Sequence, residues 1–126
     1  MSDLAGKRIL IVEDEALLAV MVADILEGQE AIVVGPAATV RKALILAEDG
    51  CIDIALLDVN LRGENIVPIA HLLYTRGTPI VFVTGYGKSP TGPWIDAPVI
   101  GKPFTEADLL GAIQQAFKTN RDVVID

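Results

Sequence analysis

The sequence predicts an α/β domain in which helices cover both faces of a single doubly wound sheet of five parallel strands. Five short apolar runs, rich in β-branched residues, are separated by segments whose apolar residues recur at helical spacing. The chain has 126 residues, enough for one such domain with a proper core and too few for two. Alternation of strands and helices favours a parallel sheet, because each helical crossover returns the chain to the same edge.

The first part of the chain predicts two strands and a helix. Residues 8–12 form an almost entirely apolar run, typical of a strand buried on both faces. Residues 15–28 carry apolar side chains at helical spacing, and we expect the additional apolar residues Val20 and Met21 to pack in the core. A second strand follows at 31–34, and the Gly-Pro pair after it favours a turn.

The middle of the chain predicts two further strands, each preceded by a helix. Thr39 is of the residue type that caps helix N-termini, and the apolar residues after it keep helical spacing as far as residue 47. Residues 53–57 form the third strand, 64–76 the next helix and 79–83 the fourth strand.

The C-terminal part predicts a short fifth strand at 97–100 and a final helix capped by Thr105. The carboxylates of Glu106 and Asp108 in the first turn favour this helix, because they interact favourably with the positive end of its dipole. Its buried side consists of Leu109, Leu110, Ile113, Ala116 and Phe117.

Composition and charge disfavour several classes of protein. The net charge is −7 and the basic residues form no cluster, which argues against direct binding to DNA. The longest apolar run, 16–23, is far below the roughly 20 residues that a membrane span needs, and no signal peptide is expected. The single cysteine, Cys51, excludes a disulfide framework. We therefore expect a cytoplasmic protein that does not enter a membrane.

Polar side chains follow four of the five predicted strands. Glu13 and Asp14 follow the first strand, Asp58 the third, Thr84 the fourth and Lys102 the fifth. The carboxyl ends of parallel strands meet at one edge of the sheet, which is where such folds bind ligands. The sequence therefore predicts that these five side chains converge.

Such a cluster suits phosphoryl transfer. Three carboxylates at close range repel one another, and Lys102 offsets one of their charges. Mg²⁺ satisfies the remainder, since it prefers oxygen ligands. Metal and ammonium together neutralise the oxygens of a phosphoryl group while Asp58 attacks in line and forms a mixed acid anhydride.

The motifs "ILIVEDE", "ALLDVNLRGEN", "VFVTGYG" and "IGKPF", in this order and spacing, resemble the receiver domain of bacterial two-component response regulators. The resemblance covers about residues 6–119. It implies a flavodoxin-like fold with strand order 2-1-3-4-5. It also implies that Mg²⁺ is held by the carboxylates of Glu13, Asp14 and Asp58 and by the backbone carbonyl of Asn60.

The same resemblance assigns roles to the remaining polar residues. Asp58 matches the phosphoacceptor, Thr84 the switch hydroxyl and Lys102 the phosphate-binding lysine, with the Lys102–Pro103 peptide cis. A sensor histidine kinase or a phosphotransfer protein would supply the phosphoryl group, and phosphorylation would change binding to an unknown downstream protein. Such a domain catalyses only its own phosphorylation and dephosphorylation and is not otherwise an enzyme.

Two departures from the family pattern narrow the resemblance. Val99 stands where the family usually has Tyr or Phe, so the usual aromatic rotation cannot transmit the signal. "VFVTGYG" is similar to the motif of the stand-alone Phe-Ala-Thr-Gly-Tyr/Gly subfamily, with Val83 in place of Ala. We expect residues 1–126 to be one receiver domain without an output domain.

Family members usually have a helix between strands four and five, within residues 86–96 of this chain. Two Gly and two Pro in this stretch disfavour a helix, since Gly costs about 1 and Pro about 3 kcal/mol in a helix interior. We expect a short helix or a mobile loop that orders or shifts on phosphorylation. Trp94 lies within this stretch and should report the change through its fluorescence.

Three alternatives remain to be weighed. A degenerate receiver would act as a binding module without phosphorylation. A haloacid-dehalogenase-like phosphatase also uses an aspartate nucleophile with Mg²⁺, but needs an acid where this chain has Asn60. "GKS" at 87–89 resembles the end of a P-loop, but Phe82 replaces the required glycine and Pro90 interrupts the helix that should follow.

Overall fold

The computed structural model describes residues 3–49, 51–85, 92–94 and 96–123. Within these residues the chain forms one parallel sheet of five strands in the order β2-β1-β3-β4-β5, which confirms the predicted fold class and strand order. The strands are β1 (Arg8–Val12), β2 (Ile32–Ala37), β3 (Ile54–Asp58), β4 (Ile80–Thr84) and β5 (Val99–Gly101). The helices are α1 (Ala16–Gly28), α2 (Val40–Leu46), α3 (Val67–Thr75) and α4 (Glu106–Val123).

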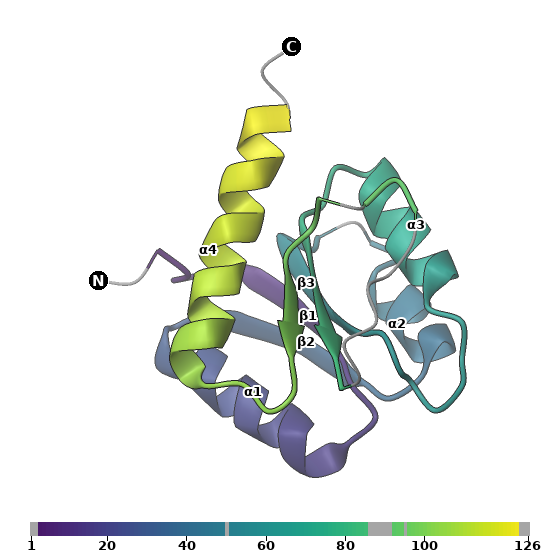
Figure 1. Ribbon diagram of the computed structural model, residues 1–126, viewed down its shortest axis with the longest axis horizontal. Helices are drawn as coiled ribbons and strands as arrows, with labels where there is room; N and C mark the ends of the chain where they lie inside the picture. The colour runs from purple at the N-terminus through teal and green to yellow at the C-terminus, as the bar shows by residue number, and fades with distance from the viewer. Residues whose placement is uncertain (1–2, 50, 86–91, 95, 124–126) are drawn as a thin grey trace.

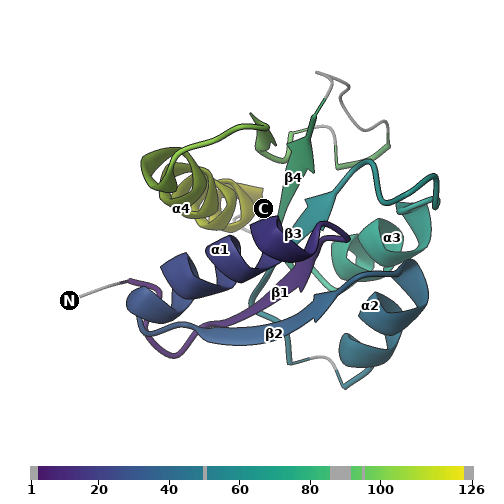
Figure 2. The same cartoon turned by 90° about the horizontal axis from the view of Figure 1, so that it is seen from below.

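The helices lie in two layers around the sheet (Figures 1 and 2). Helices α1 and α4 cover one face, and α2 and α3 cover the other, so β1, β3 and β4 are buried on both sides. Two separate apolar clusters result: Leu10, Leu57 and Phe82 are among the residues on the α2/α3 face, and Ile9 and Ile113 among those on the α1/α4 face. This burial explains why the central strands read as continuous apolar runs.

The register of the central strands brings their carboxyl ends level. Val12 pairs with Leu57, and Asp58 pairs with Val83, so the residues that follow β1, β3 and β4 leave the sheet at the same edge. The backbone N–H of Glu13 donates to the carbonyl of Ala37 over 2.9 Å, which fixes the chain where it leaves β1.

Strand β2 is longer than the sequence predicts. It continues through Gly35 and Pro36, joined by a cis peptide bond, as far as Ala37, instead of ending at residue 34. Gly35 has φ +98°, and a Cβ there would lie 2.8 Å from the backbone nitrogen of Ala37 and 3.0 Å from the carbonyl oxygen of Ile11. The pairing of β1 with β2 shifts register at this point, from Leu10 with Val34 to Val12 with Ala37. The close approach of the two backbones there is possible because glycine has no side chain.

Two other expectations about helices were wrong. Helix α3 begins at Val67 and not at 64, because the Asn65 side chain accepts a hydrogen bond from the Val67 backbone N–H over 3.0 Å and residue 66 serves as the cap. Val20 and Met21 do not pack in the core: they are 56% and 48% exposed. The sheet contacts only one side of α1, the side that carries Ala19, Val22 and Leu26.

The caps expected for α2 and α4 are confirmed. Thr39 Oγ1 accepts the backbone N–H of Lys42 over 3.1 Å. Thr105 Oγ1 accepts the backbone N–H of Asp108, and an Asp108 carboxylate oxygen accepts the backbone N–H of Thr105, both over 3.0 Å. This reciprocal pair is a capping box with Asp in place of the usual Glu or Gln.

The loop expected within 86–96 falls largely outside the described residues, which include 92–94 and 96 from this stretch. These form turns and not a helix. Trp94 is buried on the α2/α3 face, with its ring 6.4 Å from that of Phe82 and 6.3 Å from that of Tyr74, centroid to centroid. None of the helices in the described part of the chain is long and apolar enough to cross a membrane.

Candidate phosphoryl-transfer and metal site

The structure brings Glu13, Asp14 and Asp58 together at the carboxyl edge of the sheet. Within the described residues, one carboxylate oxygen of each lies within 4.8 Å of the others. Glu13 and Asp14 follow β1, and Asp58 is the last residue of β3, so the parallel topology alone accounts for their meeting. Glu13 and Asp58 are buried, Asp58 to 1% exposure.

Lys102 reaches into the acidic cluster from the end of β5. Its Nζ lies 3.0 Å from Oδ2 of Asp58 and 3.2 Å from Oε1 of Glu13. The Lys102–Pro103 peptide is cis, as expected, and the backbone N–H of Lys102 donates to the carbonyl of Thr84 over 2.8 Å. The backbone contact with Thr84 fixes the chain at Lys102, whose side chain points toward Asp58.

Glu15 is a partner of Lys102 that the sequence did not single out. Its Oε1 lies 3.3 Å from Lys102 Nζ, and its backbone N–H donates to Oε2 of Glu13 over 3.0 Å. The Glu15 side chain is 63% exposed, so its ion pair with Lys102 contributes little to stability. In the motif "EDE" the first two residues, Glu13 and Asp14, were predicted to bind the metal. Nothing in the sequence indicated that the third, Glu15, contacts Lys102.

Asp58 is tolerated at the end of a buried strand because both of its oxygens have partners. Oδ1 accepts the backbone N–H of Asn60 over 2.9 Å, and Oδ2 faces Lys102. The Val59 backbone N–H donates to the carbonyl of Val83 over 2.9 Å and carries the pairing of β3 with β4 one residue beyond the strand. A carboxylate with these partners avoids most of the cost of burying a lone charge.

The cluster shifts the protonation of two of its members. Burial raises the pKa of the Glu13 carboxyl from an ordinary 4.5 to about 7, and its contact with Asp58 adds to the rise, while the hydrogen bond from the Glu15 backbone acts the other way. Burial alone would lower the pKa of the Lys102 ammonium, but the hydrogen bond and charge of Asp58, aided by Glu13, raise it above its usual range. Lys102 is therefore charged at neutral pH.

Asp14 has a different cationic partner, which the sequence did not reveal. The Nε of Arg62, in the loop after β3, donates to Oδ2 of Asp14 over 2.9 Å. The two residues are 48 positions apart. Nothing in the local pattern around Arg62 indicates the pairing, because it depends on where the loop after β3 lies relative to the end of β1.

Thr84 and Asn60 complete the predicted set. Thr84 is the last residue of β4, next to Asp58 in the sheet, and is buried. Asn60 follows Asp58 by two residues, and its carbonyl oxygen accepts the backbone N–H of Arg62 over 3.1 Å. All the sequence-predicted site residues thus belong to the same edge of the sheet.

The residues present fit Mg²⁺. Three carboxylates and a nearby backbone carbonyl are hard oxygen donors, and their close spacing leaves negative charge that Lys102 does not neutralise. An open pocket of about 410 Å³ beside the cluster is lined by Glu15, Asn60 and Lys102 on its polar side and by Leu18 and Met21 on its apolar side. It gives solvent and ligands a route to the site.

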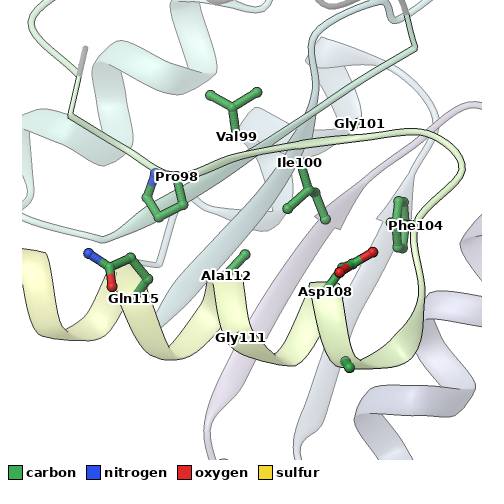
Figure 3. Close-up of a pocket in the computed structure, with 10 residues that line it drawn as sticks. Pro98, Val99, Ile100, Gly101, Phe104, Asp108, Gly111, Ala112 and Gln115 are labelled. Atoms are coloured by element: carbon green, nitrogen blue, oxygen red, sulfur yellow. The ribbon is translucent and has the colours of Figure 1, made fainter.

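A second hollow lies away from the acidic cluster, between β5 and α4 (Figure 3). This open groove has a volume of about 610 Å³, and Ile100, Phe104 and Ala112 line it. Val99, at the position where an aromatic residue is usual, points away from α4 in Figure 3 and is 39% exposed.

Comparison with known proteins identifies relatives of the chain. The family model of the response regulator receiver domain matches residues 9–114. The solution structure of SdrG from Sphingomonas melonis Fr1 is 45% identical with a TM-score of 0.80, covering 93% of this chain and 99% of that chain. The BeF3-activated conformation of SdrG is 46% identical with a TM-score of 0.72, covering 87% of this chain and 95% of that chain.

Curated relatives are longer than this chain. The transcriptional regulatory protein PdtaR of Mycobacterium tuberculosis is 31% identical over 122 residues, which cover 93% of this chain and 60% of PdtaR. Receiver domains are modules of two-component signalling that interact with histidine kinases or phosphotransfer proteins and typically bind Mg²⁺ at an acidic site. With this family match over most of its length, and with the acidic cluster at the expected edge of the sheet, the chain belongs to the response regulator receiver domain family.

Proposed function

We propose that the protein is a response regulator that accepts a phosphoryl group on Asp58 from a sensor histidine kinase or phosphotransfer protein. Phosphorylation then changes its affinity for a downstream protein. The observation that carries the proposal is the contact of Lys102 with a buried Asp58 beside two further carboxylates. Near-complete coverage of SdrG, a chain of receiver length, supports a receiver domain with a core at about residues 6–119.

In the proposed transfer an Asp58 carboxylate oxygen attacks the phosphorus of a phosphohistidine. The new P–O bond makes an acyl phosphate, the P–N bond breaks, and its electron pair stays on the imidazole nitrogen. The Asn60 backbone N–H holds the other carboxylate oxygen. The Lys102 ammonium, which covers Asp58 before the reaction, turns to the transferred phosphoryl oxygens, and the Thr84 hydroxyl, at the end of the neighbouring strand, donates to another.

Glu13, Asp14, Asp58 and the carbonyl of Asn60 would hold Mg²⁺ in this proposal. The ion would supply positive charge that offsets the phosphoryl oxygens and the carboxylates together. Deprotonation of Glu13 favours this state, because a protonated carboxyl is a poor ligand for a hard cation.

The surface beside the site suits a phosphodonor protein. Leu17, Val20 and Met21 of α1 are exposed, and Met21 also lines the pocket that leads to Lys102. Apolar side chains exposed next to a polar reaction centre are typical of a protein-binding surface. Docking there would place the phosphohistidine over Asp58. In this proposal the transfer takes place in the cytoplasm, and the receiver acts on no other substrate.

Asp58→Asn tests the assignment. The variant keeps the side-chain volume but lacks the attacking oxygen, so acetyl phosphate with Mg²⁺ should add no phosphoryl group to it, as measured by intact-protein mass spectrometry. The matched control is Asp24→Asn on the exposed surface of α1, which should be labelled like the wild type.

Normal labelling of Asp58→Asn would refute the assignment of the phosphoacceptor. Wild-type protein that is never labelled, by acetyl phosphate or by any kinase of its host, would favour the binding-module alternative. Neither outcome requires knowledge of the downstream partner.

A further inference from the structure

Arg62 contacts two of the groups that the proposed function assigns to the metal. Its side-chain Nε donates to Asp14 Oδ2 over 2.9 Å, and its backbone N–H donates to the carbonyl oxygen of Asn60 over 3.1 Å. The phosphoryl transfer described above uses neither contact. Arg62 therefore engages ligands that a bound cation would need.

Within the described residues, two cationic side chains pair with the three carboxylates of the cluster. Lys102 pairs with Glu13 and Asp58, whereas Arg62 pairs with Asp14. A guanidinium remains protonated in proteins, so its positive charge cannot be relieved by loss of a proton. A divalent cation that approaches Asp14 is therefore repelled by Arg62 and competes with it for the carboxylate.

The two members of this ion pair differ strongly in burial. The Asp14 side chain is 10% exposed and that of Arg62 is 78% exposed. Arg62 can leave at little cost because its guanidinium is already largely in water. Without Arg62, Asp14 is a mostly buried carboxylate with an uncompensated charge, which favours the binding of another cation. The arrangement suits an exchange of one cation for another.

The loop that carries Arg62 is held by contacts that do not involve its guanidinium. Leu61 is fully buried and forms an isolated bridge with Glu64, whose Oε1 accepts the backbone N–H of Val40 over 3.0 Å. Arg62 itself has φ +50°. Removal of the guanidinium should therefore leave the loop and the metal ligands in place.

We propose that Arg62 is a resident counter-ion of the acidic cluster, which pairs with Asp14 in the metal-free protein, leaves when Mg²⁺ binds, and so lowers the affinity for Mg²⁺. The inference rests on the metal site of the proposed function. Arg62 therefore acts through Asp14. It sets the Mg²⁺ concentration at which the site fills and becomes competent for phosphorylation.

Calorimetric titration of the full chain with Mg²⁺, at constant ionic strength, tests this role. Arg62→Gln should bind Mg²⁺ about two- to five-fold more tightly, the range that follows from the strength of an exposed ion pair. Arg62→Lys, which keeps the charge, should stay close to the wild type. Lys118→Gln removes the same charge beside Lys7, near the start of β1 and away from the site. It should leave the affinity for Mg²⁺ unchanged.

An affinity of Arg62→Gln equal to or below that of the wild type, or an equal gain in Lys118→Gln, overturns the role of Arg62 and leaves the proposed function standing. Asp14→Ala separates the two inferences. If the wild type gives no binding, or Asp14→Ala binds Mg²⁺ as well as the wild type, the metal site is wrong and the role of Arg62 falls with it. General damage to the fold weakens binding, so a gain in affinity has no such explanation.

Discussion

Glu13 shows how one side chain at this edge of the sheet links the fold to the charge state of the site. Its backbone is fixed by Ala37, its carboxylate accepts the Glu15 N–H, and the same carboxylate lies beside Lys102 and Asp58. Burial raises its pKa to about 7. The unfolded chain releases this proton near the ordinary value of 4.5, so between these two pH values the folded state holds a proton that the unfolded state has lost.

This difference predicts a pH dependence of stability. In metal-free protein the contribution of Glu13 is fully present below pH 4.5 and is lost as pH rises through about 7, with a slope of at most about 1.4 kcal/mol per pH unit, the value for one proton. Urea unfolding at several pH values with a chelator present measures it. Glu13→Gln should remove most of the slope in this window, whereas Glu15→Gln should keep it. Equal slopes in wild type and Glu13→Gln would show that another group is responsible.

At the scale of an element, the start of α4 is held by local hydrogen bonds. Its capping box consists of Thr105, three residues after Lys102, and Asp108. The sequence indicates this cap because both of its partners lie within one turn.

Thr105→Ala should lower the free energy of unfolding by about 1 kcal/mol, because one backbone N–H of the first turn loses its acceptor. Thr105→Ser, which keeps the hydroxyl, should unfold close to the wild type. Chemical denaturation measures both. A Thr105→Ala variant as stable as the wild type would mean that solvent satisfies the helix end equally well.

At the scale of the whole molecule, Trp94 connects β4 with α3 on the α2/α3 face of the sheet. Trp94 packs against Phe82 of β4, two residues before Thr84, and against Tyr74 of α3. Its indole Nε1 is buried without a hydrogen-bond partner in the described part of the chain. Such a group favours any state in which it reaches water, because an unpaired buried donor costs about 1–3 kcal/mol.

Movement of Thr84 toward a phosphoryl group on Asp58 should therefore disturb the packing of Trp94. Beryllofluoride with Mg²⁺, which mimics the phosphoryl group, should shift the emission of Trp94 to longer wavelength as the indole gains contact with water. Asp58→Asn should show no shift. Trp94 is the single tryptophan, so the signal has one source. Emission that is unchanged in the wild type, or that shifts equally in Asp58→Asn, would exclude Trp94 from the response.

The sequence by itself determined the succession of strands and helices along the chain and the edge of the sheet at which the site lies. Continuous apolar runs mark strands buried on both faces, and in a parallel sheet the residues that follow such strands meet. Asp58 and Lys102 could therefore be placed together although they are 44 positions apart. The caps Thr39 and Thr105 were equally predictable, since each acts within one turn.

Only the tertiary structure decided which neighbours these residues have. Val20 and Met21 have helical spacing that suits burial, yet they are exposed because no element within the described residues covers that side of α1. The pairing of Arg62 with Asp14 and the passage of β2 through Gly35 depend on how separate segments lie against one another. Periodicity reports the local conformation of a segment, whereas ion pairs, exposed faces and irregular strand pairing arise from contacts between segments, which no local pattern encodes.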